Sequence, residues 1–188
     1  ADDGLIRKMA DEYREMENHG YSEDGGFDWW KAQDKAIGNN VSIKDVMGEY
    51  GMKAGTCMSA FMLYDQKSLD IIKKNFNSIT FENELKPDFV FNKDKSIAAG
   101  ELVVEFSDDT IKLLDWCKEN DMSLRGHTII WHSQTPDWIF YEGFDKANGL
   151  ASRDVMLARM ESYIKQTFEK LDELGYIEMF YAYDVVNE

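Results

Sequence analysis

The stretch SRDVMLARMESYIKQTFEKLDELGYIEMFYAYDVVNE, residues 152–188, predicts a long helix followed directly by a buried strand. One face of the helix is formed by residues that recur at steps of three or four: Met156, Met160, Tyr163, Thr167, Leu171 and Leu174. Ser152 is suited to cap the start of this helix, and Gly175 to end it. Residues 179–186 are mostly apolar and aromatic on both faces, which is typical of a strand in a parallel sheet covered by helices.

Upstream of this stretch the chain repeats the same alternation. Further strands are expected at residues 52–59, 78–84 and 123–131. A helix through residues 69–76 separates the first two of these, and a helix capped by Ser107 precedes the third. Four strands and three helices in alternation predict an α/β fold of the TIM (β/α)8 type, which takes about 250 residues when complete. The chain is expected to supply about the first four β-strands of that barrel.

Residues 1–50 form a preamble to this alternation, and residues 51–188 are expected to form the first half of the barrel domain. The helical runs predicted in the preamble cover residues 5–16 and 42–50. The pair Trp29–Trp30 could stack on a sugar if it were exposed, but an aromatic pair that seals the preamble against the barrel is the favoured interpretation.

Composition limits the partners of this chain. Its 188 residues include 36 acidic and 21 basic side chains, and the resulting charge of −15 opposes the binding of nucleic acid. A neutral polymer needs no charge attraction and is compatible with such a surface. The sequence has no apolar run of the roughly 20 residues that a membrane span requires. No signal peptide is visible, so the sequence indicates either a cytoplasmic protein or a mature secreted form.

Cysteine and histidine indicate no metal or redox site. Cys57 falls in a predicted strand and Cys117 in a predicted helix, so both are expected to be buried free thiols. The three histidines have no zinc-site spacing relative to these cysteines: His19, His127 and His132. We therefore expect neither a metal nor a cofactor.

Polar residues gather where the predicted strands give way to loops. Residues 82–86 (ENELK) end the second strand, and residues 125–127 (RGH) and 131–134 (WHSQ) lie in and after the third. Asn187 and Glu188 follow the fourth. In a β/α barrel the carboxyl ends of the strands face the substrate, so these clusters are expected to share one site.

The chemistry of these clusters suits a sugar. Amide, amine and imidazole groups can donate hydrogen bonds to hydroxyls, and carboxylates can accept them. The face of Trp131 can pack against a sugar ring, and a carboxylic acid with a raised pKa can protonate a glycosidic oxygen. The alternative interpretation is a satisfied polar network in the barrel mouth with no ligand.

Three segments resemble the motifs of glycoside hydrolase family 10. They are FNSITFENELKPD at residues 76–88, LRGHTIIWHSQTPDW at 124–138 and AYDVVNE at 182–188, in the order and spacing of the family. The resemblance extends from about Met52 to Glu188. Apolar or aromatic residues replace the family's usual ones at three positions: Phe81 for proline, Leu85 for methionine and Tyr183 for tryptophan.

The resemblance implies a retaining endo-1,4-β-xylanase, a secreted or cell-surface bacterial enzyme whose signal peptide has been removed. In this family pattern Glu188 is the general acid/base, and Asn187 holds the 2-hydroxyl of the sugar being cleaved. The other implied substrate-binding residues are Glu82, Asn83, Lys86, His127 and Trp131. Two further residues are expected to support the site: His132 and Gln134.

The resemblance also implies that the nucleophile lies on a later strand, outside this chain. Retaining hydrolysis needs a second carboxylate, and an open half-barrel would leave two strand edges unpaired. We therefore expect the chain to act on xylan with the complementary C-terminal half of the same domain, from a second chain or a longer sequence. The first alternative is a non-catalytic xylan-binding half-barrel, which Glu188 disfavours because binding alone needs no acid there. The second is a barrel hydrolase that acts on another β-glucan.

Overall fold

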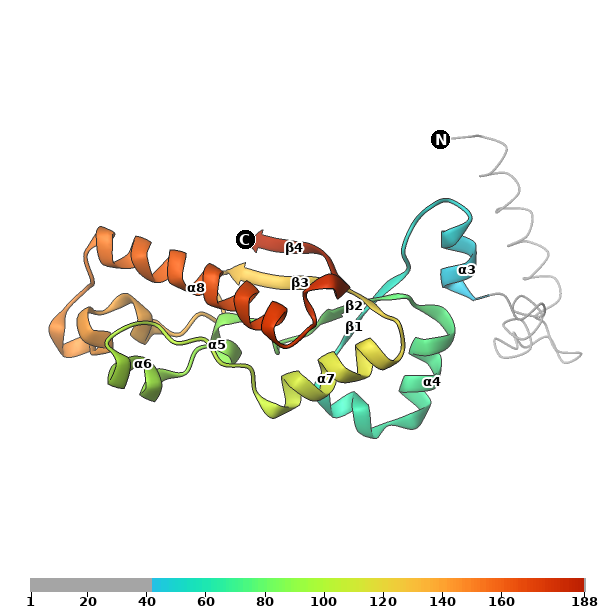
Figure 1. Cartoon of the computed structure of the whole chain (residues 1–188), viewed down its shortest axis with the longest axis horizontal. Coiled ribbons are helices and arrows are strands. Elements are labelled where there is room, and N and C mark those ends of the chain that lie inside the picture. Colours follow the sequence, from blue (N-terminus) through green and yellow to red (C-terminus); the bar gives the residue numbers. More distant parts are fainter. Residues whose placement is uncertain (1–41, 188) are drawn as a thin grey trace, which may run out of the picture.

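Four parallel strands form one sheet in the computed structural model, which describes residues 42–187 (Figure 1). They are β1 (Gly55–Met58), β2 (Ser78–Phe81), β3 (Ser123–Ile130) and β4 (Phe180–Val186), in the spatial order β1-β2-β3-β4. Each strand pairs in parallel with the next strand along the chain. This arrangement confirms the predicted α/β fold with about four strands of a TIM barrel.

One helix or more separates each pair of strands. The long ones are α4 (Gln66–Asn75), α7 (Asp108–Glu119) and α8 (Arg153–Glu173), and the short α3 (Ile43–Gly48) precedes β1. The predicted caps are present: the Ser107 and Ser152 hydroxyls accept hydrogen bonds from Thr110 N (3.1 Å) and Val155 N (3.3 Å). Gly175, just beyond α8, has φ +74°, a left-handed conformation that ends a helix at little cost in glycine.

The main core lies between one face of the sheet and these helices. Its strand residues are Met58, Ile79, Phe81 and Leu124, and its helix residues include Leu69, Ile72, Leu113, Leu114, Cys117 and Leu171. Burial of each large apolar side chain of this kind stabilises the fold by about 1.5–3 kcal/mol. The helices α4, α7 and α8 therefore cover the same face of the sheet (Figure 1).

A second core lies beneath the β2–α7 and β3–α8 connections, where the sequence predicted no helix or strand. The β2–α7 connection contains α5 (Pro87–Val90) and α6 (Lys93–Ala99), and an isolated antiparallel bridge joins Phe91 to Val104. The buried members of this core are Val90, Leu102, Val104, Ile129, Ile139, Phe144 and Tyr163. Short 3-10 turns complete the chain: η1 (Ala60–Tyr64), η2 (Asp137–Phe140), η3 (Glu142–Phe144), η4 (Lys146–Asn148) and η5 (Ile177–Met179).

The opposite face of the sheet carries no helix of the described residues. Successive side chains of a strand point to opposite faces, so Leu124 lies in the core while Arg125 and His127 lie on the other face. We call this second face the open face. Within residues 42–187 no further strand pairs with the outer edge of β1 or β4, and Val185 and Val186 at the end of β4 are exposed.

The structure corrects two expectations. Residues 82–84 belong to the turn after β2 rather than to the strand. Cys117 is a buried free thiol as predicted, but Cys57 is free and exposed. The reason is strand alternation, because the next residue, Met58, takes the core-facing position and leaves Cys57 on the open face. The helix expected at residues 5–16 and the Trp29–Trp30 pair lie outside the described residues.

Candidate active site

The turn after β2 is held in place by hydrogen bonds of two carboxylates, that of the buried Glu84 and that of the exposed Glu82. Glu84 is buried, and its carboxylate accepts hydrogen bonds from Ala60 N (2.7 Å) and Asn83 N (3.0 Å). Ser59, at the end of β1, donates its hydroxyl to the carboxylate of Glu82. Because these contacts join the ends of β1 and β2, Glu82 and Asn83 are presented in a defined conformation beyond the sheet.

Lys86 is the centre of a polar cluster at this end of the sheet. Although only 7% of the residue is exposed, its Nζ donates to Gln134 Oε1 (2.7 Å) and to Asn83 Oδ1 (3.3 Å). The same ammonium lies 4.9 Å from the ring centroid of Trp131. Gln134 Nε2 also donates to Asn83 Oδ1 (3.0 Å). These partners offset the cost of removing the charge from water and give each side chain one orientation.

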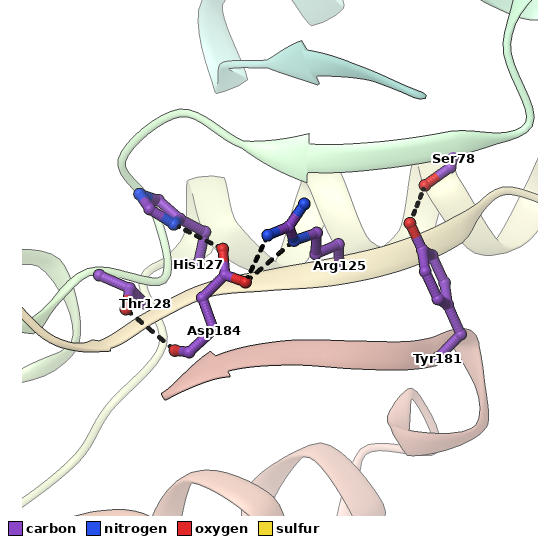
Figure 2. A network of polar contacts seen from close by, with 6 residues as sticks. All are labelled: Ser78, Arg125, His127, Thr128, Tyr181 and Asp184. Atoms are coloured by element: carbon purple, nitrogen blue, oxygen red, sulfur yellow. Dashed lines mark hydrogen bonds and ion pairs between the residues drawn. The ribbon is translucent and has the colours of Figure 1, made fainter. Parts of the chain in front are cut away.

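A second cluster lies on the open face between β3 and β4 (Figure 2). His127 and Asp184 are direct partners in the strand register, and His127 Nδ1 lies 2.9 Å from Asp184 Oδ2. Arg125 donates from Nε (2.9 Å) and Nη2 (2.7 Å) to Asp184 Oδ1. Burial of Asp184 opposes its ionisation, but the hydrogen bonds from Arg125 and His127 outweigh it and lower the pKa of this carboxyl. Asp184 is therefore ionised at neutral pH.

Backbone contacts tie the end of β4 to β3. The register shifts between His127 and Ile130, and in this interval the Thr128 hydroxyl donates to the Asp184 carbonyl (2.9 Å). Beyond it, Asn187 N donates to the Ile130 carbonyl (2.8 Å). Asn187 therefore leaves the sheet at a defined point next to β3. Glu188 lies outside the described residues.

Trp131 joins the two clusters. Its ring contacts Lys86 of the first cluster, and its centroid lies 6.4 Å from that of His127 in the second. His132 is exposed and packs edge-on against the same ring at 5.8 Å. The indole Nε1 is buried and has no hydrogen-bond partner among the residues that the structure describes. The two clusters and Trp131 thus form one continuous polar and aromatic surface.

The predicted site residues are largely brought together, but the prediction was incomplete. Lys86, Gln134 and Asn83 contact one another, Glu82 adjoins Asn83, and the rings of His127, Trp131 and His132 form a row. The sequence assigned no role to the organising residues Ser59, Glu84, Arg125 and Asp184, although Glu84 and Arg125 lie in the clusters that it predicted. A signal existed for two of them, because Arg125 and Asp184 are charges within predicted strands that are otherwise largely apolar, where unpaired charges are rare.

No group of three or more His, Cys, Asp or Glu side chains within residues 42–187 is arranged to hold a metal ion. In the same range, every helix is too short or too polar to cross a membrane.

The fold and the site define a class. Parallel strands alternate with helices that cover one face, and polar side chains converge beyond the carboxyl ends of the strands, as in β/α-barrel proteins. A sequence model of glycosyl hydrolase family 10 matches residues 42–188. The chain belongs to glycosyl hydrolase family 10.

Relatives and solved structures agree with this family. The chain is 38% identical to the bifunctional endo-1,4-beta-xylanase XylA of Ruminococcus flavefaciens and 36% identical to endo-1,4-beta-xylanase Y of Acetivibrio thermocellus. These matches cover 81% and 79% of this chain but only 16% and 14% of the relatives. A Clostridium thermocellum xylanase 10B structure with CBM22-1 and GH10 modules, complexed with xylohexaose, matches with a TM-score of 0.69 and 34% identity. That match covers 79% of this chain and 28% of the solved chain.

Proposed function

We propose that this chain forms the sugar-binding half of the active site of a retaining endo-1,4-β-xylanase. One observation carries the proposal: Lys86, Asn83 and Gln134 form a fixed polar cluster that reaches His127 through Trp131, in a family 10 chain. The two relatives described above are named endo-1,4-beta-xylanases, and the solved neighbour was captured with xylohexaose.

The roles follow from the chemistry of each group. Glu82, Asn83 and Lys86 bind hydroxyls of the xylose units on the glycone side, and Trp131 packs beneath the sugar about to be cleaved. His127 binds a hydroxyl of that sugar. Two residues after β4 complete the roles: Asn187 holds the 2-hydroxyl, and Glu188 donates a proton to the glycosidic oxygen and later activates water.

The second carboxylate must come from elsewhere in the barrel. In retaining hydrolysis a nucleophilic carboxylate about 5–5.5 Å from the acid attacks the anomeric carbon, and water later releases the sugar. We assign this group to the complementary C-terminal half of the domain, in the same polypeptide or a second chain. The unpaired edges of β1 and β4 within the described residues support this assignment, because they can continue into further strands.

The charge and the substrate suit each other. Xylan backbone units are neutral, so a chain with charge −15 meets no repulsion from them, whereas a nucleic-acid backbone would be repelled. A polysaccharide does not cross a membrane, so an enzyme that cleaves it acts outside the cell or at its surface. The family also includes the bacterial relatives described above.

The test is Glu188→Gln in the protein that carries the whole barrel, with Glu161→Gln on the exposed side of α8 as the matched control. We expect loss of xylan turnover by a factor of at least about 10², with retained binding of xylohexaose by calorimetry. The control should keep full turnover. Unchanged turnover in Glu188→Gln would remove Glu188 from the mechanism. A wild-type protein that binds xylohexaose but never cleaves it would instead be the non-catalytic binding module. Faster cleavage of another β-glucan than of xylan would overturn the substrate assignment.

A further inference from the structure

Asp184 has no sugar-binding role in the proposed function, yet it takes part in four hydrogen bonds with side chains of β3. Its Oδ1 accepts two hydrogen bonds from Arg125 and its Oδ2 faces His127 Nδ1. Its backbone carbonyl accepts from Thr128. Figure 2 shows the carboxylate between the Arg125 and His127 side chains. The contacts of this one residue therefore reach three side chains of the neighbouring strand: the Arg125 guanidinium, the His127 imidazole and the Thr128 hydroxyl.

The contact with His127 determines which ring nitrogen carries the proton. An ionised carboxylate can only accept hydrogen bonds, so a ring nitrogen 2.9 Å from Asp184 Oδ2 must be protonated. In the neutral ring the other nitrogen, Nε2, is then an acceptor. The two hydrogen bonds from Arg125 and the lowered pKa of Asp184 keep the carboxylate in the form that enforces this arrangement.

We propose that Asp184 is a positioning residue for His127, which holds the ring in one orientation with the proton on Nδ1 and presents Nε2 to a hydroxyl of the bound sugar. The part of this inference that concerns catalysis rests on the proposed xylanase function. Arg125 supports the arrangement by occupying the second oxygen of Asp184, so that this oxygen cannot compete for the imidazole.

The decisive variant is Asp184→Asn. It keeps the shape of the side chain, but its amide can turn an N–H toward Nδ1 and so favour the proton on Nε2. In metal sites, loss of the hydrogen-bond partner that orients a ligating histidine lowers affinity or activity by about 10–100-fold. We expect a fall of this size in kcat/KM on xylotetraose. The fall should lie mainly in kcat, because a contact that strengthens in the transition state affects kcat more than KM.

A readout that does not depend on activity is the tautomer of His127. Nitrogen–proton correlation spectra of the histidine rings, assigned by loss of one set of signals in His127→Gln, distinguish Nδ1–H from Nε2–H. We expect Nδ1–H in the wild type and a shift toward Nε2–H in Asp184→Asn. An Nε2–H ring in the wild type overturns the inference even if the variant does not fold. A changed tautomer with unchanged kcat/KM overturns the claim that the orientation matters for catalysis.

The control is Tyr181→Phe on β4, the strand of Asp184. It removes the hydrogen bond between the Tyr181 hydroxyl and Ser78 Oγ of β2 (2.9 Å, Figure 2). It should leave both the His127 spectrum and kcat/KM unchanged, and an equal loss in this variant would show that any disturbance of β4 has the same effect. Failure of the proposed function is seen separately, because a wild-type protein without xylan hydrolysis still reports the His127 tautomer.

Discussion

The two faces of the sheet are made by the same strands and have opposite chemistry. On the covered face, Leu124 lies in the main core together with residues of α4, α7 and α8, with 1% of its surface exposed. On the open face the next residue, Arg125, has 53% of its side chain exposed and pairs with Asp184. Residues that stabilise the fold and residues that form the site are therefore adjacent along one strand, because successive side chains point in opposite directions.

The largest expected contrast is between these two neighbours. Leu124→Ala should lower the free energy of unfolding by about 2–5 kcal/mol, because it removes buried methyl groups and leaves a cavity. Arg125→Ala should lower the free energy of unfolding by less than about 1 kcal/mol, because water screens the ion pair that Arg125 forms with Asp184. Urea unfolding followed by circular dichroism measures both. Equal losses would mean that the open face is covered as tightly as the core in the complete barrel.

Gly126, which follows Arg125 on β3, tests how closely the strands pack on the covered face. A Cβ added there would lie 2.1 Å from the Tyr183 ring, so Gly126→Ala forces the ring or the strand to move. We expect a loss of about 1–3 kcal/mol, typical of overpacking, in the same unfolding assay. The double variant Gly126→Ala/Tyr183→Ala should lose less stability than the sum of the losses in the two single variants. Strictly additive losses would contradict the clash.

The smallest expected effect is the pH dependence of the open-face ion pair. Because the pKa of Asp184 is lowered in the folded protein, its contribution is present above the unfolded value of about 3.9 and is lost as the pH falls through the folded pKa. The pair with Arg125 is partly exposed, so the contribution at pH 7 should not exceed about 1 kcal/mol. The stability difference between wild type and Asp184→Asn should shrink between pH 5 and pH 2. A difference that grew on acidification would contradict the ionised state of Asp184.

Much of the fold could be predicted because its signals are local. Ser107 and Ser152 cap helices as expected, and all four strands occur in the predicted order. The helices α5 and α6 were missed because they are short and rely on tertiary contacts, such as the bridge between Phe91 and Val104. The exposure of Cys57 was missed for a related reason, since a short apolar run does not reveal which of its residues face the helices.

The alternation of strands and helices, the family motifs and the residue types available for sugar binding all follow from local sequence. Periodicity, caps and motif order are properties of neighbouring residues, and they are readable without a structure. Which side chains meet depends instead on how distant segments pack in the folded chain. The contacts of Lys86 with Gln134 and of His127 with Asp184 join residues 48 and 57 positions apart. The β3–β4 register makes the second of these contacts, because it sets His127 directly beside Asp184 on the open face.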